Sequence, residues 1–338
     1  MRAVVVEDAN RVVVRDVPEP RPPGPYEALA KVVCGSLCNN TDLKIAHRQL
    51  HFVKDYPTIL GHEVVGRVVE VGSEVRSFGP GDMISRPHAA VPPETGLFES
   101  WGGFTEYGLV TDTRAMAEAG LTTERPTQIP APPDFDPVAL SQMITLRETL
   151  SFLSNLGVTA GQSVLIFGTG PVGVAFSLVA DQLGLSPRIV VGRRQAALER
   201  ALHFGRATHV IDNTRERVPE AVRRITGGAG VDWAIEAIGA DAVLPEAFDS
   251  LNAAGWVGLY GVPPAAEVGS PLRRSDRVKQ AAVVEAAANE TIMDWVTRRL
   301  VPAREFVTHE LPMAEVARGL ELLERKEAFK VALWMEPR

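Results

Sequence analysis

The chain has 338 residues, which is enough for two domains of ordinary size, each with its own core. Its hydrophobic fraction of 45% and its scattered glycines and prolines indicate a globular protein rather than a disordered or fibrous one. The formal net charge is -7 and there is no basic tract, which argues against nucleic acid or an anionic membrane as a partner. The apolar run at residues 164–167 is far too short to cross a bilayer.

The N-terminal residues turn polar too early for a secretion signal, and residues 1–7 predict a β-strand instead. Without an export signal, a cytoplasmic protein is the expectation. The two cysteines, Cys34 and Cys38, cannot make a disulfide framework. A bridge between them is not expected in a reducing compartment.

Short β-branched segments separated by glycine and proline fill residues 1 to about 130. They predict an antiparallel, barrel-like β domain with irregular loops. The clearest predicted strands are residues 11–14, 30–34, 63–71 and 104–110.

From about residue 137, predicted helices and strands alternate. The helices are expected at residues 139–156, 172–183, 195–204, 219–225 and 242–251. The strands are expected at residues 164–167, 188–191, 208–211, 231–235 and 255–260. This alternation predicts a parallel sheet covered by helices on both faces.

The C-terminal part breaks the alternation. Residues 279–287 predict a strand at a sheet edge, and residues 290–300 predict a helix. An amphipathic helix at residues 314–325 and a strand at residues 329–334 follow. We expect these last two elements to return to the first domain.

A glycine-rich turn joins an apolar strand to a helix at residues 164–173, Val-Leu-Ile-Phe-Gly-Thr-Gly-Pro-Val-Gly. In this G-x-G-x-x-G, the first glycine permits a tight turn, the second lets the backbone approach a pyrophosphate, and the third allows close helix packing. Proline suits the first helical turn, where its missing N–H has no partner to lose. The helix N-terminus then favours an anion. The predicted dinucleotide-binding residues are Gly168, Thr169, Gly170, Pro171, Val172 and Gly173.

The end of the next predicted strand distinguishes NAD from NADP. An NAD-preferring site keeps an acidic residue there to bind the ribose hydroxyls. This chain instead has Gly192, Arg193 and Arg194, so nothing repels a 2′-phosphate and two guanidiniums can clamp it. We therefore predict NADP as the cofactor. The alternative is that both arginines simply begin the next helix in solvent.

Residues 61–66, Gly-His-Glu-Val-Val-Gly, continue to Gly72 and Val75 in the pattern G-H-E-x-x-G-x-x-x-x-x-G-x-x-V. This pattern resembles the zinc signature of the medium-chain alcohol dehydrogenases. Residues 38–43, 79–82 and 103–107 resemble the first-ligand segment and two loops of the same family. With the glycine turn included, the resemblance covers nearly the whole chain.

The resemblance implies an α/β fold in which a Rossmann doubly wound parallel sheet is combined with a β-rich, GroES-like barrel domain. It places both chain ends, residues 1–146 and 288–338, in the GroES-like catalytic domain. Residues 147–287 then form the dinucleotide-binding Rossmann domain.

In the family, Cys38 and His62 correspond to ligands of a catalytic zinc ion, and Glu63 lies beside the metal. A thiolate, an imidazole and a carboxylate suit zinc with one open position. Zinc there polarises a carbonyl oxygen or stabilises an alkoxide so that hydride can leave. We expect Asp42 to orient His62.

The usual third ligand, a Cys, Asp or Glu, has no counterpart here, because its position falls at Met143 or Ile144. Glu148 lies one helical turn later. It is a ligand if the helix is a turn shorter, or it replaces a family threonine that touches the nicotinamide, or it is a surface carboxylate paired with Arg147. No cysteine occurs in residues 88–101, so a second, structural zinc is not expected.

Proton transfer needs a route from a buried oxygen to water. The resemblance favours the Thr41 hydroxyl as the first relay, followed by Lys44 or His47. The alternative for Lys44 is an ordinary solvated lysine. Trp101 and Phe104 either line the substrate side or belong to the core.

These features predict an NADP-dependent oxidoreductase that transfers hydride between the nicotinamide and a small alcohol, aldehyde or ketone, assisted by zinc. One alternative is a zinc-free reductase of quinones or activated C=C bonds. Another is a non-catalytic, NADP-binding redox sensor. Relatives commonly pair through sheet edges, so the predicted strand at residues 279–287 favours a homodimer or homotetramer. No arginine in the loops marks a carboxylate-bearing substrate.

Overall fold

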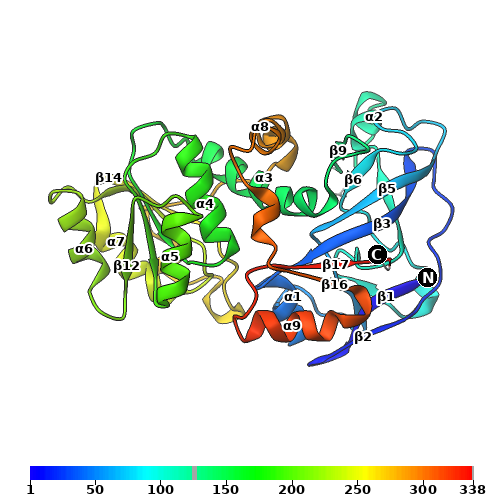
Figure 1. Cartoon of the computed structure of the whole chain (residues 1–338), viewed down its shortest axis with the longest axis horizontal. Helices are drawn as coiled ribbons and strands as arrows, with labels where there is room; N and C mark the ends of the chain where they lie inside the picture. Colours follow the sequence, from blue (N-terminus) through cyan, green and yellow to red (C-terminus); the bar gives the residue numbers. More distant parts are fainter. Residues whose placement is uncertain (124–127, 337–338) are drawn as a thin grey trace. The chain divides into compact units, whose positions relative to one another are not determined.

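The structure is a computed structural model that describes residues 1–123 and 128–336 (Figure 1). The chain divides into two compact units, one formed by Met1–Ile144 and Pro302–Arg338, the other by Thr145–Val301. Residues 288–301 thus group with the second unit, although the predicted division placed them in the first.

Two β-sheets build the first unit. In the smaller sheet, the order is β2 (Arg11–Asp16), β1 (Arg2–Asp8), β4 (Thr58–Ile59) and β7 (Phe98–Glu99). In the larger sheet, the order is β16 (His309–Pro312), β17 (Val331–Trp334), β3 (Glu27–Leu37), β5 (Val64–Val71), β6 (Met83–Ser85) and β9 (Pro130–Ala131), and β8 (Tyr107–Thr111) also pairs with β3. Because β17 pairs antiparallel with β3, the C-terminal part of the chain completes the N-terminal sheet.

The central strand of the larger sheet is β3, whose residues alternate between buried and partly exposed over most of its length. This period of two is what a half-buried strand requires, because successive side chains point to opposite faces. On its buried face, Ala28 and Ala30 pack with Val68, Ile84 and Val110. The helices of this unit are α1 (Thr41–Ala46), α2 (Thr113–Glu118) and α9 (Val316–Glu324).

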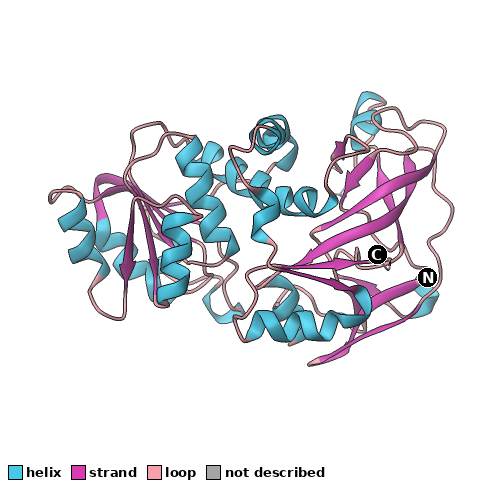
Figure 2. Ribbon diagram, in the orientation of Figure 1, coloured by secondary structure: helices cyan, strands magenta, loops and turns pink. Residues whose placement is uncertain are grey.

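The second unit is a parallel sheet with helices on both faces, and it confirms the predicted fold class (Figure 2). The strand order is β12 (His209–Asp212), β11 (Arg188–Gly192), β10 (Val164–Phe167), β13 (Val231–Glu236), β14 (Leu251–Leu259) and β15 (Val278–Lys279). The helices are α4 (Pro171–Gln182), α5 (Gln195–His203), α6 (Val218–Ile225), α7 (Leu244–Ser250) and α8 (Glu285–Thr297), while α3 (Pro137–Leu156) runs from one unit into the other. From β10 the strands are added first toward one edge of the sheet, through β11 and β12, and then toward the other edge, from β13 onward. Parallel sheets of this kind bind ligands at the point between β10 and β13 where the strand order changes.

The predicted strand at residues 279–287 is wrong. Only Val278–Lys279 form a strand, and α8 already begins at Glu285. Residues 286–288 are consecutive alanines, the strongest helix formers. The N–H of Val284 donates to Ser151 Oγ at 2.7 Å, which ties the start of α8 to α3. The prediction of a homodimer or homotetramer therefore loses its argument, which was a long strand at the sheet edge.

Single turns of 3-10 helix also occur, at Pro93–Thr95, Asp241–Val243, Ala265–Glu267, Leu272–Arg274, Ala303–Phe306 and Met313–Glu315. Throughout the two described ranges, every helix is too short or too polar to traverse a lipid bilayer.

Candidate functional site

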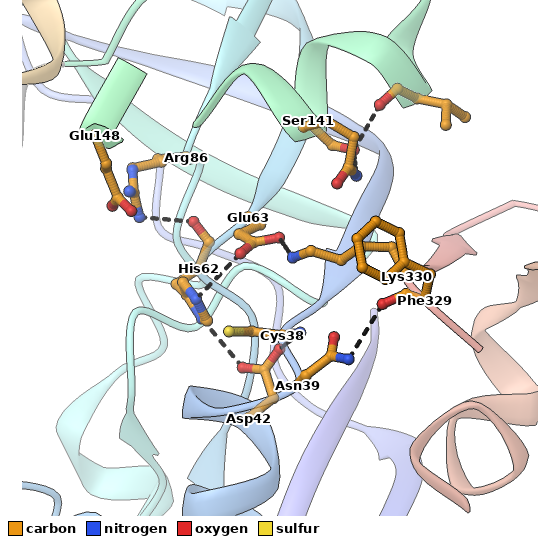
Figure 3. A network of polar contacts seen from close by, with 12 residues as sticks. Cys38, Asn39, Asp42, His62, Glu63, Arg86, Ser141, Glu148, Phe329 and Lys330 are labelled. Carbon is orange, nitrogen blue, oxygen red and sulfur yellow. Dashed lines mark hydrogen bonds and ion pairs between the residues drawn. The ribbon is translucent and has the colours of Figure 1, made fainter. Parts of the chain in front are cut away.

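Three residues from the predicted zinc signature and the first-ligand segment meet in the first unit (Figure 3). Cys38 directly follows β3, while His62 and Glu63 directly precede β5, the antiparallel neighbour of β3. The Sγ of Cys38, a ring nitrogen of His62 and a carboxylate oxygen of Glu63 all lie within 4.8 Å of one another. His62 and Glu63 are buried, and Cys38 is partly exposed. This set of donors fits a divalent, borderline-soft metal ion.

Asp42, fully buried in the first turn of α1, holds two of these groups in place. Its Oδ2 accepts a hydrogen bond from the N–H of Cys38 at 2.8 Å, and its Oδ1 lies 3.1 Å from Nδ1 of His62. A carboxylate can only accept, so Nδ1 carries the proton. The opposite nitrogen, Nε2, lies 3.8 Å from Glu63 Oε1 and is the one left for a metal.

The charges around His62 favour its protonated form when no metal is bound. Burial lowers the pKa of His62, but the negative charge of Asp42 and hydrogen bonds with Asp42 and Cys38 raise it, and the net pKa is well above the usual range. A metal binds the neutral imidazole, so binding here would release that proton.

Lys330 belongs to this site although the sequence analysis did not single it out. Its side chain is buried, and its ammonium forms an ion pair with Oε2 of Glu63 (Figure 3). Nδ2 of Asn39 donates to the carbonyl of Phe329 at 3.1 Å, which fixes the residue before Lys330 against the Cys38 loop. Burial lowers the pKa of Lys330, but the charge of Glu63 raises it further, so the amine stays protonated. The one available signal in the sequence is a single lysine within the apolar stretch at residues 328–335.

Removing this ammonium should make the first unit depend on a metal. In Lys330→Met, we expect the free energy of unfolding in EDTA to fall by about 3–5 kcal/mol, because the buried Glu63 carboxylate loses its ammonium partner. Zinc should then raise the melting temperature more in the variant than in the parent protein, because it offers Glu63 a replacement cation. Thermal unfolding with EDTA and with zinc measures both effects.

The double variant Lys330→Met/Glu63→Gln is the matched control for that experiment. It removes both charges, so its stability in EDTA should recover most of the loss. A single variant as stable as the parent protein in EDTA would show that the ion pair contributes nothing.

The position of the usual third ligand holds none. Met143 and Ile144 are fully buried apolar side chains in α3. The preceding Gln142 is 2% exposed, and its Nε2 donates to Ser141 Oγ at 2.9 Å, while its Oε1 has no partner among the described residues. Ser141 Oγ donates in turn to the Val138 carbonyl at 2.8 Å. An amide oxygen suits hard cations better than zinc.

Glu148 lies in the second unit, in the middle of a long helix. Its Oε2 accepts a hydrogen bond from the Tyr260 hydroxyl at 2.8 Å. Because α3 continues to Leu156, the alternative of a helix one turn shorter is wrong. A role of Glu148 beside the nicotinamide stays a prediction.

The predicted relay residues all lie on or next to α1. Thr41 opens the helix and is partly exposed, and Lys44 lies in its last turn. His47 follows the helix with its Nδ1 at Asn10 Oδ1 and its Nε2 2.7 Å from Glu324 Oε1. Both ring nitrogens are thus engaged, so His47 could pass a proton only if these contacts opened. The relay stays a prediction.

A small cavity of about 40 Å³ adjoins His62. Its walls are Gly61, His62, Arg86, Pro87, His88, Trp101 and Gln128. The Trp101 ring lies 5.3 Å from that of His62, and Trp101 has a φ of 65°, a conformation that non-glycine residues rarely adopt. Phe104, in contrast, is fully buried in the core. In the sequence, no arginine in the loops was predicted to mark a carboxylate-bearing substrate. In the structure Arg86 lies at the candidate site, where its Nη1 donates to the His62 carbonyl at 2.7 Å.

The glycine turn of the second unit has the shape of a diphosphate site. Gly168 has a φ of 125°, and a Cβ on Gly173 would lie 1.9 Å from the Gly168 carbonyl, so both positions require glycine. A Cβ on Gly170 would meet nothing within 4 Å, which leaves open space at the N-terminus of α4. Pro171 occupies the first helical turn. The turn thus offers backbone N–H groups next to a space that an anion can fill.

Positive charge gathers at the end of the neighbouring strand, β11. A Cβ on Gly192 would lie 2.4 Å from Thr169 Cγ2, so the structure brings these two predicted cofactor residues together. Arg193 and Arg194 are exposed, and neither forms an ion pair within the described residues. Burial and the charge of Arg194 lower the pKa of Arg200, which indicates that a third guanidinium is close. Such a cluster fits a phosphate group.

Comparison with known proteins agrees with both halves of this description. Residues 24–119 match the model of the alcohol dehydrogenase GroES-like domain, and residues 171–298 match that of the zinc-binding dehydrogenase.

A curated relative and two solved structures extend the match beyond these two segments. An L-threonine 3-dehydrogenase of Pyrococcus abyssi is 34% identical over 74% of this chain and 71% of its own. The alcohol dehydrogenase of Thermus sp. ATN1 has a TM-score of 0.82 and 28% identity, covering 99% of both chains. A structure described as a zinc-binding dehydrogenase of Sinorhizobium meliloti 1021, bound to NADP, has a TM-score of 0.79 and 25% identity, covering 98% of both chains. The chain therefore belongs to the medium-chain dehydrogenase/reductase superfamily of oxidoreductases.

Proposed function

We propose that the protein is an NADP-dependent, zinc-assisted alcohol dehydrogenase or carbonyl reductase acting on small alcohols, aldehydes or ketones. The net reaction would convert a carbonyl compound, NADPH and a proton into an alcohol and NADP⁺, or the reverse. The observation that carries the proposal is the donor set of Cys38, His62 and Glu63, with the Nδ1 of His62 held by Asp42.

The proposed roles follow from the chemistry of each group. A zinc ion held by Cys38, His62 and Glu63 would supply Lewis-acid polarisation of the substrate oxygen. Asp42 keeps His62 in the tautomer that ligates through Nε2. Thr41 would pass the proton between that oxygen and solvent.

For the cofactor, the glycine turn would bind the diphosphate and the arginine pair would bind the 2′-phosphate. Open space at Gly170 and the unpaired Arg193 and Arg194 support this assignment. The relative that was solved with NADP bound is consistent with it.

One observation favours the zinc-free alternative, a reductase of quinones or activated C=C bonds. The Lys330 ammonium already neutralises Glu63, so the site is electrostatically balanced without a metal. The apolar Met143 and Ile144 also deprive a metal of a further ligand.

Metal analysis followed by steady-state kinetics tests the proposal. The purified protein should contain about one zinc per chain, and kcat/KM with NADPH should exceed that with NADH at least tenfold, about 1.4 kcal/mol. Equal use of both cofactors would refute the NADP assignment. A metal-free protein that reduces quinones but no ketone or aldehyde would establish the alternative.

A further inference from the structure

The loop that follows β13, residues 237–240, lies beside the glycine turn within the second unit. Glu236, the last residue of β13, is the parallel-strand partner of Phe167, the last residue of β10. A Cβ on Gly168 would lie 3.4 Å from Cγ1 of Ile238, and Ile238 exposes 44% of its surface. A dinucleotide bound at the glycine turn would therefore meet this loop on the β13 side.

The place of the loop indicates which half of the dinucleotide it would meet. The diphosphate is proposed at the turn after β10, and the 2′-phosphate at Arg193 and Arg194, after β11. Since β11 and β13 flank β10 on opposite sides, the adenosine half would extend over β11. The nicotinamide half would then lie on the β13 side, because such cofactors bind across the point where the strand order changes.

A buried carboxylate determines the shape of this loop. Oε1 of Glu236 accepts hydrogen bonds from the N–H groups of Ile238 at 2.7 Å, Gly239 at 2.5 Å and Ala240 at 3.4 Å. The Glu236 side chain is fully buried. Hydrogen bonds to a charged oxygen are stronger than neutral ones, so the carboxylate holds the loop in one turn. The conformation of the loop thus depends on a negative charge that has no access to solvent.

Arg273 supplies the opposite charge. It lies in the 3-10 turn Leu272–Arg274, is 7% exposed, and places its Nη2 at 3.5 Å from Oε2 of Glu236. Its Nε donates to Oδ1 of Asp241, the residue after the loop, at 2.7 Å. The N–H of Asp241 in turn donates to Oε2 of Glu267 at 2.7 Å. The segment that carries Glu267 and Arg273 therefore holds the loop at both of its ends.

We propose that Arg273 is a positioning residue for the nicotinamide half of the cofactor. Its guanidinium pairs with the Glu236 charge and binds Asp241, and so keeps residues 237–240 in the conformation that receives the dinucleotide. Arg273 acts through the loop and not through contact with the reacting atoms. This inference rests on the proposed function, because it takes binding of NADP at the glycine turn as its starting point.

Binding of the whole cofactor, compared with binding of its adenosine half, separates this role from general stabilisation of the unit. In Arg273→Met, the Kd for NADPH, measured by fluorescence titration, should rise about tenfold or more, because the buried Glu236 charge loses its partner and the loop loses its fixed shape. The Kd for adenosine 2′,5′-bisphosphate, which lacks the nicotinamide half, should stay within about twofold by calorimetry. Arg273→Lys keeps the charge without the planar fork, so it should regain part of the affinity for NADPH.

Arg274 provides the matched control, because it is the next residue of the same turn and is exposed. Arg274→Met removes the same charge and should leave both dissociation constants unchanged. Equal losses for the two ligands in Arg273→Met, or an unchanged Kd for NADPH, would overturn the inference. If the methionine variant does not fold, Arg273→Lys decides the question, since its smaller loss should again be confined to NADPH.

These binding measurements need no turnover, so the inference and the proposed function can fail separately. A parent protein that binds NADPH and reduces no carbonyl compound would refute the proposed activity, and the Arg273 comparison would still decide the inference. A parent protein that binds NADH instead would refute the NADP assignment, and NADH and ADP would then serve as the two ligands. A parent protein that binds neither dinucleotide would refute both.

Discussion

Cys38→Ser is expected to abolish zinc binding and to lower kcat/KM for carbonyl reduction by about 10³-fold. The hydroxyl of serine stays protonated near neutral pH, whereas the metal requires an anionic sulfur. Polarisation of the substrate oxygen by a metal contributes several kcal/mol to the transition state, and about 4 kcal/mol corresponds to a thousandfold in rate. Metal content by elemental analysis and rates with NADPH, measured on the same preparation, test both expectations.

The chain contains its own control, since Cys34 is its other cysteine. It lies within β3 and is fully buried, outside the group of Cys38, His62 and Glu63. Cys34→Ser should keep the zinc content of the parent protein. If Cys38→Ser kept both its zinc and its rate, the metal site would lie elsewhere and the zinc-assisted mechanism would be wrong.

The double variant Arg193→Ala/Arg194→Ala should lose most of the preference for NADPH. Each charge-assisted hydrogen bond to a phosphate contributes about 1.5–3 kcal/mol, so kcat/KM with NADPH should fall about 10²-fold. The value with NADH should change little, because NADH carries no 2′-phosphate. Steady-state kinetics with both cofactors give the ratio.

Arg215 and Arg217 provide the matched control, since both are largely exposed arginines of the same unit. Arg215→Ala/Arg217→Ala removes the same charge and should leave the ratio of NADPH to NADH unchanged. An unaltered ratio in the Arg193/Arg194 variant would instead mean that those side chains merely begin α5 in solvent.

Local sequence patterns predicted the second unit well. The strand at residues 164–167 has the bounds of β10, and the glycine turn has the predicted conformation at Gly168 and packing at Gly173. Strand, turn and helix there follow one another directly, so neighbouring residues determine the structure. The false strand at residues 279–287 shows the limit of this reasoning, because an apolar run fits either a strand or a helix.

The candidate site was predicted only where a motif marked it. His62 and Glu63 belong to the zinc signature and Cys38 to the first-ligand segment, and their proximity in the structure follows from the pairing of β3 with β5. Lys330 carries no such mark. The contact of Lys330 with Glu63 joins positions 267 residues apart. Pattern reasoning does not detect such distant partners.

The long separation in sequence between Lys330 and Glu63 has a consequence for biosynthesis. A ribosome makes Glu63 267 residues before Lys330. Until β17 docks on β3, the Glu63 carboxylate lacks the Lys330 ammonium, and a nascent protein that has not reached Lys330 would have to enclose this carboxylate without that partner. Burial of Glu63 together with its ammonium is therefore tied to the synthesis and docking of β17.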